Sequence, residues 1–302
     1  MRILVSGARG FIGGELVRFF ERRGDVVYRL TRSPSRSQDI YWNTEQGILD
    51  LSKLDRLDVV VHLAGENIGS GYWTFRRKRR ILESRERGTK LLCEKIVQME
   101  QPPEVLISAS GISCYSGLGG HVHTEADSYG CGFLANVCMR WEAATNLACK
   151  AGIRVVTLRL GLVLGSSGGV LRKMLPAFRM GLGGPIGNGK QAVSWISLED
   201  VLGIVDHCIS DMRVQGPVNT IAPDQINNWF FSKTLSKVLN RPCFFKIPAT
   251  LIRCLLGEMG RETLLSDISA SPNVLIEKGY KFRHPTLMDA LSHILQKPRG
   301  DN

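Results

Sequence analysis

The chain of 302 residues opens with MRILVSGARGFIGGELVRFF (residues 1–20), and this stretch decides the fold. The apolar run before the glycines predicts a β-strand, and the apolar positions after them predict an amphipathic helix. Three glycines separate the two elements with the spacing Gly7-x-x-Gly10-x-x-Gly13. A strand, a glycine-rich turn and a helix in this order are typical of a dinucleotide-binding unit.

Each glycine of this turn has a distinct expected role. Gly7 can take the sharp turn, Gly10 lets the backbone approach a pyrophosphate, and Gly13 lets the helix lie close to the strand. The first helical residues, Phe11 and Ile12, would offer free N–H groups to phosphate at the positive end of the helix dipole. The alternative is an ordinary strand-to-helix turn that happens to be rich in glycine.

The residues after the second predicted strand indicate which dinucleotide would bind. An NAD site places an acidic residue there, where it binds the ribose 2′-hydroxyl. This chain has Thr31, Arg32 and Ser33 instead, and Arg9 of the glycine turn is expected to point to the same region. Two guanidinium groups without a carboxylate suit a 2′-phosphate, so we expect NADP(H).

Further along, apolar runs alternate with amphipathic stretches, which predicts a Rossmann-type, doubly wound parallel sheet of the α/β class with a smaller, mostly helical C-terminal domain. We expect an NADP(H)-binding domain over residues 1–165, with a return segment near 190–222, and a mainly substrate-binding C-terminal domain over 166–302. Long helices are predicted over 74–99 and 133–151, and a mobile, glycine-rich loop near a substrate pocket over 165–191.

Two further predicted strands end at polar or small residues. Ala64, Gly65 and Glu66 follow an apolar strand, where the backbone could pass close to the cofactor, and Arg85 of the next helix could reach a cofactor phosphate. Ser110 ends the strand after that helix. Because ligands bind beyond the carboxyl ends of strands in open α/β sheets, we expect Ser110 to face a substrate.

Composition narrows the class of protein. There is no apolar run long enough to cross a membrane, and the first predicted strand leaves no room for a signal peptide, so we expect a cytoplasmic protein with its 8 cysteines reduced. The net charge of +11 includes a basic run at 76–80, which we interpret as a solvated helix face rather than a nucleic-acid surface. The loop over 114–132 contains His121 and His123, but their spacing matches no common zinc pattern, so no metal site is predicted.

Several motifs together resemble the extended short-chain dehydrogenase/reductase superfamily, and more narrowly its atypical epimerase-like branch, the NAD-dependent epimerase/dehydratase family with its own C-terminal domain. The resemblance spans nearly the whole chain. It is carried by GARGFIG (7–13), HLAGEN (62–67), SAS (108–110), TE (124–125), FLA (133–135), WE (141–142), GGPIG (183–187), LNRP (239–242) and GYKF (279–282).

The resemblance implies site residues and also exposes a departure. By it, the glycine turn with Arg9, together with Arg32, Ala64 and Gly65, would bind the cofactor, and Ser110 would match the catalytic serine or threonine. The superfamily places a Tyr-x-x-x-Lys pair on the following helix, but those positions fall at Leu134 and Cys138 here. We therefore consider Ser110, Tyr115 and Tyr129 as catalytic candidates.

Two functions stay open at this point. The first is an NADP(H)-dependent oxidoreductase or epimerase-like enzyme with a substituted proton donor, acting on a small molecule that the sequence does not identify. The second is a catalytically silent NADP(H)-binding sensor or regulatory protein, which the missing pair favours. A homodimer through a long helix such as 74–99 would fit the superfamily.

Overall fold

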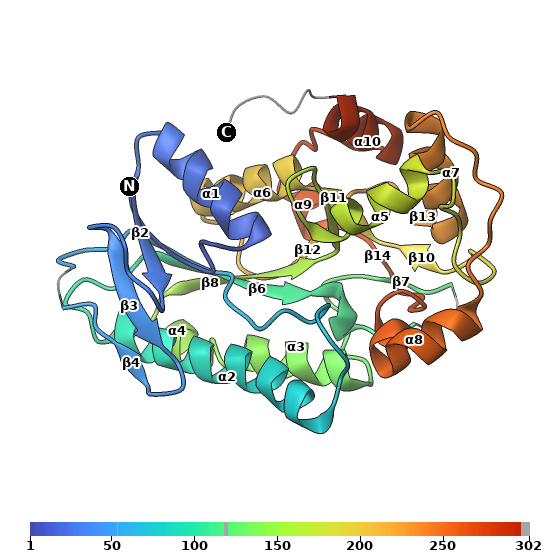
Figure 1. Ribbon diagram of the computed structural model, residues 1–302. Coiled ribbons are helices and arrows are strands. Elements are labelled where there is room, and N and C mark those ends of the chain that lie inside the picture. Colours follow the sequence, from blue (N-terminus) through green and yellow to red (C-terminus); the bar gives the residue numbers. More distant parts are fainter. Residues whose placement is uncertain (53, 118–119, 297–302) are drawn as a thin grey trace. The chain divides into compact units, whose positions relative to one another are not determined.

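The computed structural model describes residues 1–52, 54–117 and 120–296 of the chain (Figure 1). These residues form two compact units, each built from several stretches of sequence. The first unit comprises Met1–Gly111, Asn136–Arg159 and Leu202–Val218, and the second comprises Ile112–Ala135, Leu160–Val201 and the described residues from Asn219 onward. The chain thus passes between the two units more than once.

An eight-stranded sheet organises the first unit. Parallel pairing joins five of its strands, and the edge strand β4 is antiparallel to β3. The sheet confirms the predicted doubly wound, mainly parallel architecture. In spatial order, its strands are β12 (Gly216–Thr220), β8 (Arg154–Leu160), β6 (Val105–Gly111), β5 (Val59–His62), β1 (Arg2–Ser6), β2 (Val26–Thr31), β3 (Asp39–Asn43) and β4 (Ile48–Leu49).

Helices cover both faces of this sheet, with α1 (Phe11–Arg22) on one side and α2 (Phe75–Val97) with α4 (Asn146–Lys150) on the other (Figure 1). α1 buries Gly13, Leu16, Val17 and Phe20, which recur at helical spacing on one face. α2 begins where the Thr74 hydroxyl accepts a hydrogen bond from the backbone N–H of Arg77, at 3.2 Å. The predicted helix over 74–99 is therefore confirmed.

The predicted single helix over 133–151 is wrong, because the structure has two helices there. α3 spans Phe133–Ala143, and α4 begins only at Asn146. At the break, the Thr145 hydroxyl donates to the backbone carbonyl of Glu142, at 2.7 Å. A threonine hydroxyl that bonds to the backbone in this way competes with the helical pattern.

The second unit has short strand pairs and helices around its own core, in which Leu171, Trp195, Phe231 and Leu287 are buried. Its C-terminal part is mainly helical, as predicted. Its elements are β7 (Val122–His123), β9 (Leu162–Leu164), α5 (Gly169–Arg179), β10 (Ala192–Val193), β11 (Trp195–Ser197), β13 (Ile226–Asn227), α7 (Asn228–Val238), α8 (Ala249–Glu262), β14 (Ser269–Ala270), α9 (Asn273–Glu277) and α10 (Leu287–Gln296), with a 3-10 turn at Ile112–Cys114. The remaining helix among the described residues is α6 (Leu198–Ser210).

The glycine-rich segment over 165–191 is not one long loop as predicted, since α5 occupies its middle. A Cβ on Gly184 would lie 1.7 Å from the carbonyl oxygen of Phe245, and one on Gly183 would lie 2.3 Å from the Phe178 ring. These glycines are needed because other atoms pack directly against the backbone. No helix in the described ranges is both long and apolar enough to cross a membrane.

Candidate active site

The turn between β1 and α1 leaves room only for glycine at two of its three glycine positions. Gly7 has a φ of 72°, in the left-handed region. A Cβ on Gly13 would lie 2.2 Å from the carbonyl oxygen of Gly7, so the helix could not approach the strand with any larger residue. A Cβ on Gly10 would meet, among the described residues, only that same oxygen at 3.1 Å, so the other side of Gly10 is open.

The open side of Gly10 adjoins the N-terminus of α1. Gly10 is the N-cap and has no side chain with which to cap the helix, and the first turn holds no acidic residue. The helix therefore begins at Phe11 and Ile12 without a side-chain cap and without a negative charge in its first turn. Such a start favours an anion, so the turn fits a cofactor pyrophosphate.

A chain of buried hydrogen bonds fixes the loop after β5 against this turn. The Thr89 hydroxyl donates to the carbonyl of Arg85 at 2.7 Å, so it accepts from Nε2–H of His62 at 2.9 Å. His62 Nδ1 then accepts from the Ser6 hydroxyl at 2.7 Å, and Ser6 Oγ accepts from the N–H groups of Leu63 and Ala64 at 3.1 and 3.2 Å. Each side-chain nitrogen or oxygen of Ser6, His62 and Thr89 thus takes part in a hydrogen bond, and these bonds hold the backbone at Ala64 in place.

His62 is thereby a structural residue rather than an acid or base. Burial, with a smaller contribution from the charge of Arg85, lowers the pKa of His62 to about 3. The imidazole is neutral at physiological pH, as the hydrogen-bond chain requires.

Arg9 lies where the sequence predicted, at the loop after β2. Its Nη2 donates to the carbonyl of Ser33 at 2.7 Å, and the Thr31 hydroxyl accepts from the Ser33 N–H at 3.2 Å. Arg32 is exposed on the same loop. The residues predicted to bind the 2′-phosphate thus lie close together: Arg32 is on the loop after β2, and Arg9 is on the glycine turn that contacts this loop.

The first carboxylate after this loop is already bound by the protein. Asp39 accepts from Arg29 at 2.8 Å and from the N–H groups of Ser35 and Arg36 at 2.8 and 3.0 Å. Burial raises the pKa of Asp39, but these N–H groups and the Arg29 charge outweigh it and hold the pKa below its ordinary value. Asp39 therefore organises the loop and does not take the place of the acidic residue of an NAD site.

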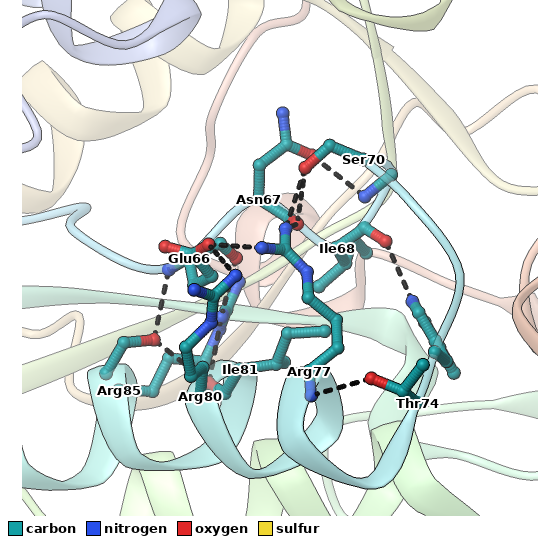
Figure 2. A network of polar contacts seen from close by, with 12 residues as sticks. Glu66, Asn67, Ile68, Ser70, Thr74, Arg77, Arg80, Ile81 and Arg85 are labelled. Atoms are coloured by element: carbon teal, nitrogen blue, oxygen red, sulfur yellow. Dashed lines mark hydrogen bonds and ion pairs between the residues drawn. The ribbon is translucent and has the colours of Figure 1, made fainter.

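Figure 2 shows how the segment after Ala64 is tied to α2. The Arg77 guanidinium bonds to the Glu66 carboxylate, to the carbonyl of Asn67 and to the hydroxyl of Ser70. The Glu66 N–H donates to Ser84 Oγ at 3.0 Å. In this arrangement the Glu66 side chain binds Arg77, and its predicted contact with the cofactor stays a prediction.

The Arg85 side chain packs against the same segment, and this contact explains why residue 65 is a glycine. Its Nη1 donates to the carbonyls of Glu66 and Ile81 at 3.0 and 3.1 Å, and its guanidinium lies 4.8 Å from the centre of the Trp141 ring. A Cβ on Gly65 would lie 2.9 Å from the Arg85 guanidinium carbon. Burial lowers the pKa of Arg85 to about 10, and the side chain holds the loop; its predicted contact with a cofactor phosphate stays a prediction.

The basic run over 76–80 is partly paired with acidic residues. Arg79 bonds to Glu83 one turn later at 2.8 Å, and Arg80 lies 3.6 Å from Glu66. These pairs are typical of a solvated helix face and favour that interpretation over a nucleic-acid surface.

Ser110 lies in a buried cluster that the sequence did not predict. Its hydroxyl donates to Glu142 Oε1 at 2.6 Å, and Arg159 binds the same carboxylate through Nε at 3.1 Å and Nη2 at 2.9 Å. The Arg159 and Glu142 side chains are only 5% and 9% exposed. One signal was present in the sequence, because Arg159 is a charged residue within an apolar strand and such a residue needs a buried partner.

The positions of the missing catalytic pair are apolar and buried. Leu134 and Cys138 are 5% and 6% exposed. Cys138 Sγ lies 3.6 Å from the carbonyl of Gly111, and burial raises the pKa of the thiol to about 11. Cys138 is therefore a neutral thiol and does not supply the positive charge of a lysine.

The two tyrosine candidates belong to the second unit, whereas Ser110 belongs to the first. Tyr115 is 2% exposed, and its hydroxyl lies 2.9 Å from the carbonyl of Thr124 and 2.8 Å from Asn219 Oδ1. Tyr129 is 39% exposed. These contacts give Tyr115 a structural role, and a catalytic role for either tyrosine stays a prediction.

Known protein families and relatives match nearly the whole length of this chain. The model of the NAD dependent epimerase/dehydratase family matches residues 3–220, and a domain of unknown function (DUF1731) matches residues 247–294. Epimerase family protein SDR39U1 of Homo sapiens is 34% identical over 298 residues, covering 98% of this chain and 100% of the relative. Epimerase family protein Mb2239 of Mycobacterium bovis is 35% identical over 297 residues, 98% of each chain.

Solved structures agree with the sequence relatives. The crystal structure of human SDR39U1 (isoform2) with NADPH has a TM-score of 0.92 at 33% identity, over 99% of this chain and 100% of that chain. The UDP-N-acetylglucosamine 4-epimerase of Bacillus cereus has a TM-score of 0.76 at 17% identity, over 99% and 100%, which supports the fold alone. The resemblance inferred from the motifs is confirmed, and the chain belongs to the NAD dependent epimerase/dehydratase family.

Proposed function

We propose that the chain binds NADP(H) at the turn between β1 and α1 and acts as an oxidoreductase of the epimerase-like short-chain dehydrogenase/reductase type, without the Tyr-x-x-x-Lys pair. The observation that carries the proposal is the contact of Arg9 with the loop of Thr31, Arg32 and Ser33. The first carboxylate after these residues, Asp39, is bound by Arg29 and by the backbone N–H of Ser35. The NADPH in the human relative supports the same choice of cofactor.

The residues at hand fit the parts of the cofactor. The N–H groups of Phe11 and Ile12 at the start of α1 would bind the pyrophosphate, which Gly10 admits. Arg9 and Arg32 would bind the 2′-phosphate through charge-assisted hydrogen bonds. Ala64 and Gly65 would contact the cofactor through backbone that the Ser6–His62 chain holds in place.

Replacing Arg32 by Asp tests the assignment of the 2′-phosphate. Loss of one charge-assisted contact and gain of a repulsive charge should weaken NADPH binding by about 10- to 100-fold, since such contacts contribute roughly 1.5–3 kcal/mol. NADH, which has no 2′-phosphate, should lose far less. The measurement is a fluorescence titration of each cofactor against the wild-type chain and the variant.

The matched control is Arg22→Asp, which makes the same change of charge at an exposed site in the last turn of α1. It should leave both affinities within about twofold, because exposed charges at a distance are screened by salt. Equal losses of NADPH and NADH binding in Arg32→Asp would contradict the assignment.

The Ser110 cluster offers a substitute for the missing tyrosine. When bound, the nicotinamide would supply or accept the hydride. The Ser110 hydroxyl already donates to Glu142, so Ser110 can take a proton from a substrate hydroxyl as it passes its own to the carboxylate. Arg159 stabilises the negative charge on Glu142 and orients it. For reduction of a carbonyl the same path would run in reverse.

Ser110→Ala and Glu142→Gln test this proton path. Each should lower turnover of a carbonyl substrate by about 100-fold or more, as expected for loss of a positioned acid or base, without weakening NADPH binding. Ser108→Ala, on the same buried strand, is the matched control and should keep wild-type turnover. Unchanged rates in Ser110→Ala would rule out the serine.

A catalytically silent NADP(H)-binding sensor is the second candidate. It is favoured by the apolar residues at the positions of the pair, Leu134 and Cys138. A silent protein would bind NADPH tightly but would not oxidise it with any member of a broad carbonyl panel. Substrate-dependent NADPH oxidation that Ser110→Ala removes would exclude the sensor.

A further inference from the structure

One carboxylate oxygen in the second unit faces two histidines. His121 Nε2 lies 2.7 Å from Asp127 Oδ2, and His123 Nδ1 lies 2.8 Å from the same oxygen. The sequence predicted no metal site here, because the two histidines alone match no common zinc spacing. The structure adds Asp127 as a third group.

The hydrogen bonds of His123 determine where its proton lies. His123 Nε2 is 2.7 Å from the carbonyl of Ser116, and a carbonyl oxygen only accepts. Nε2 therefore carries a hydrogen, and Nδ1 is the ring nitrogen that faces Asp127 Oδ2.

His123 is held as metal-bound histidines are held. It is only 4% exposed, and its ring stacks on Tyr115 with centroids 4.6 Å apart and planes 6° apart. Its second nitrogen donates to a backbone carbonyl, which is the usual outer contact of a metal ligand because it fixes the tautomer and the ring orientation.

We propose that His121, His123 and Asp127 form a binding site for a divalent transition metal ion, for which Zn²⁺ is the best match. The ligand atoms all lie within 4.8 Å of one another. Two imidazoles and one carboxylate are ligands that Zn²⁺ prefers, and three protein ligands leave a fourth position for water or a substrate oxygen.

A second group of two histidines and one carboxylate has a different arrangement. His284 Nε2 and His293 Nε2 lie 3.2 and 3.0 Å from different oxygens of Glu199. Each ring faces its own carboxylate oxygen, whereas His121 and His123 both face one oxygen of Asp127. This group supplies the matched control.

The test is titration of the chelator-treated full chain with Zn²⁺ by calorimetry, and with Co²⁺ by visible absorption. One ion per chain should bind, with a Co²⁺ spectrum typical of tetrahedral coordination and without a thiolate band. Asp127→Asn, which keeps the shape of the side chain, and His121→Ala, at an exposed position, should each weaken binding by about 100-fold or more. Glu199→Gln should bind as the wild type does.

Four results would overturn the proposal. The wild-type chain could fail to bind Zn²⁺, which would mean that the two histidines only form hydrogen bonds with Asp127. Binding could persist in folded Asp127→Asn and His121→Ala, or it could disappear in Glu199→Gln. A Co²⁺–thiolate band would place the ion on a cysteine instead.

Discussion

The turn after β1 and the end of β6 lie in the same unit but are built in opposite ways. The turn is local, since Gly7, Gly10 and Gly13 follow one another within one strand–helix unit. The Ser110 cluster is assembled from distant segments, with Glu142 32 residues further along and Arg159 another 17 residues on. A local motif can be recognised from spacing alone, whereas a cluster of this kind becomes visible only when the fold brings its parts together.

Arg159→Met should show the largest effect, because it breaks the assembled cluster from within. The variant would leave the Glu142 carboxylate buried without its cation, which typically costs about 3–5 kcal/mol of unfolding free energy. Urea denaturation of the variant against the wild type measures this loss. Arg213→Met is the control, since Arg213 forms an ion pair with Asp211 while its side chain is 72% exposed, and it should cost less than about 1 kcal/mol.

If Arg159→Met were no less stable than Arg213→Met, the buried cluster would have no energetic importance. The Ser110 cluster would then not be a site whose assembly stabilises the fold, and its contrast with the local glycine turn would no longer hold.

Gly13→Ala tests the local turn. Its Cβ would clash with the Gly7 carbonyl, so we expect a loss of about 2–3 kcal/mol in stability, with much weaker NADPH binding. The next residue is a close control, because a Cβ on Gly14 would lie 3.5 Å from the carbonyl of Ala8, an ordinary contact. Gly14→Ala should be neutral or gain up to about 1 kcal/mol, as alanine favours a helix. Equal behaviour of the two variants would show that the spacing of the glycines is incidental.

His62→Gln sharpens the comparison, because His62 joins the local turn to α2 through Ser6 and Thr89. Well above pH 6.5 the histidine is neutral in both states and contributes no pH dependence. As the pH falls from 6.5 toward 3, the unfolded chain takes up a proton that the folded chain excludes, so stability is lost. The wild type should therefore lose up to about 1.4 kcal/mol per pH unit more than His62→Gln in that window. Parallel pH profiles of unfolding free energy would contradict the neutral, buried histidine.

Sequence patterns predicted the elements whose signals are local. The glycine turn, the helix at 74–99, the parallel sheet and the position of Arg9 all follow from periodicity and from residue chemistry. The break between α3 and α4 was missed because it depends on one threonine hydroxyl, and α5 was missed because the glycines around it dominated the pattern.

The candidate site was predicted only in part, for the same reason. Ser110 stood out at a strand end, but its partners Glu142 and Arg159 are ordinary charged residues until the sheet places them together. The structural role of His62 was also hidden, since only the folded chain shows that Ser6 and Thr89 use both of its ring nitrogens.

The most direct test of the central claim is a titration of the purified wild-type chain with NADPH and NADH, followed by fluorescence and by thermal shift. A ligand that binds only the folded state raises its apparent stability. Our account predicts that NADPH binds at least about tenfold more tightly than NADH and raises the melting temperature more at equal concentration. Equal affinity for the two cofactors, or no binding of either, would contradict it.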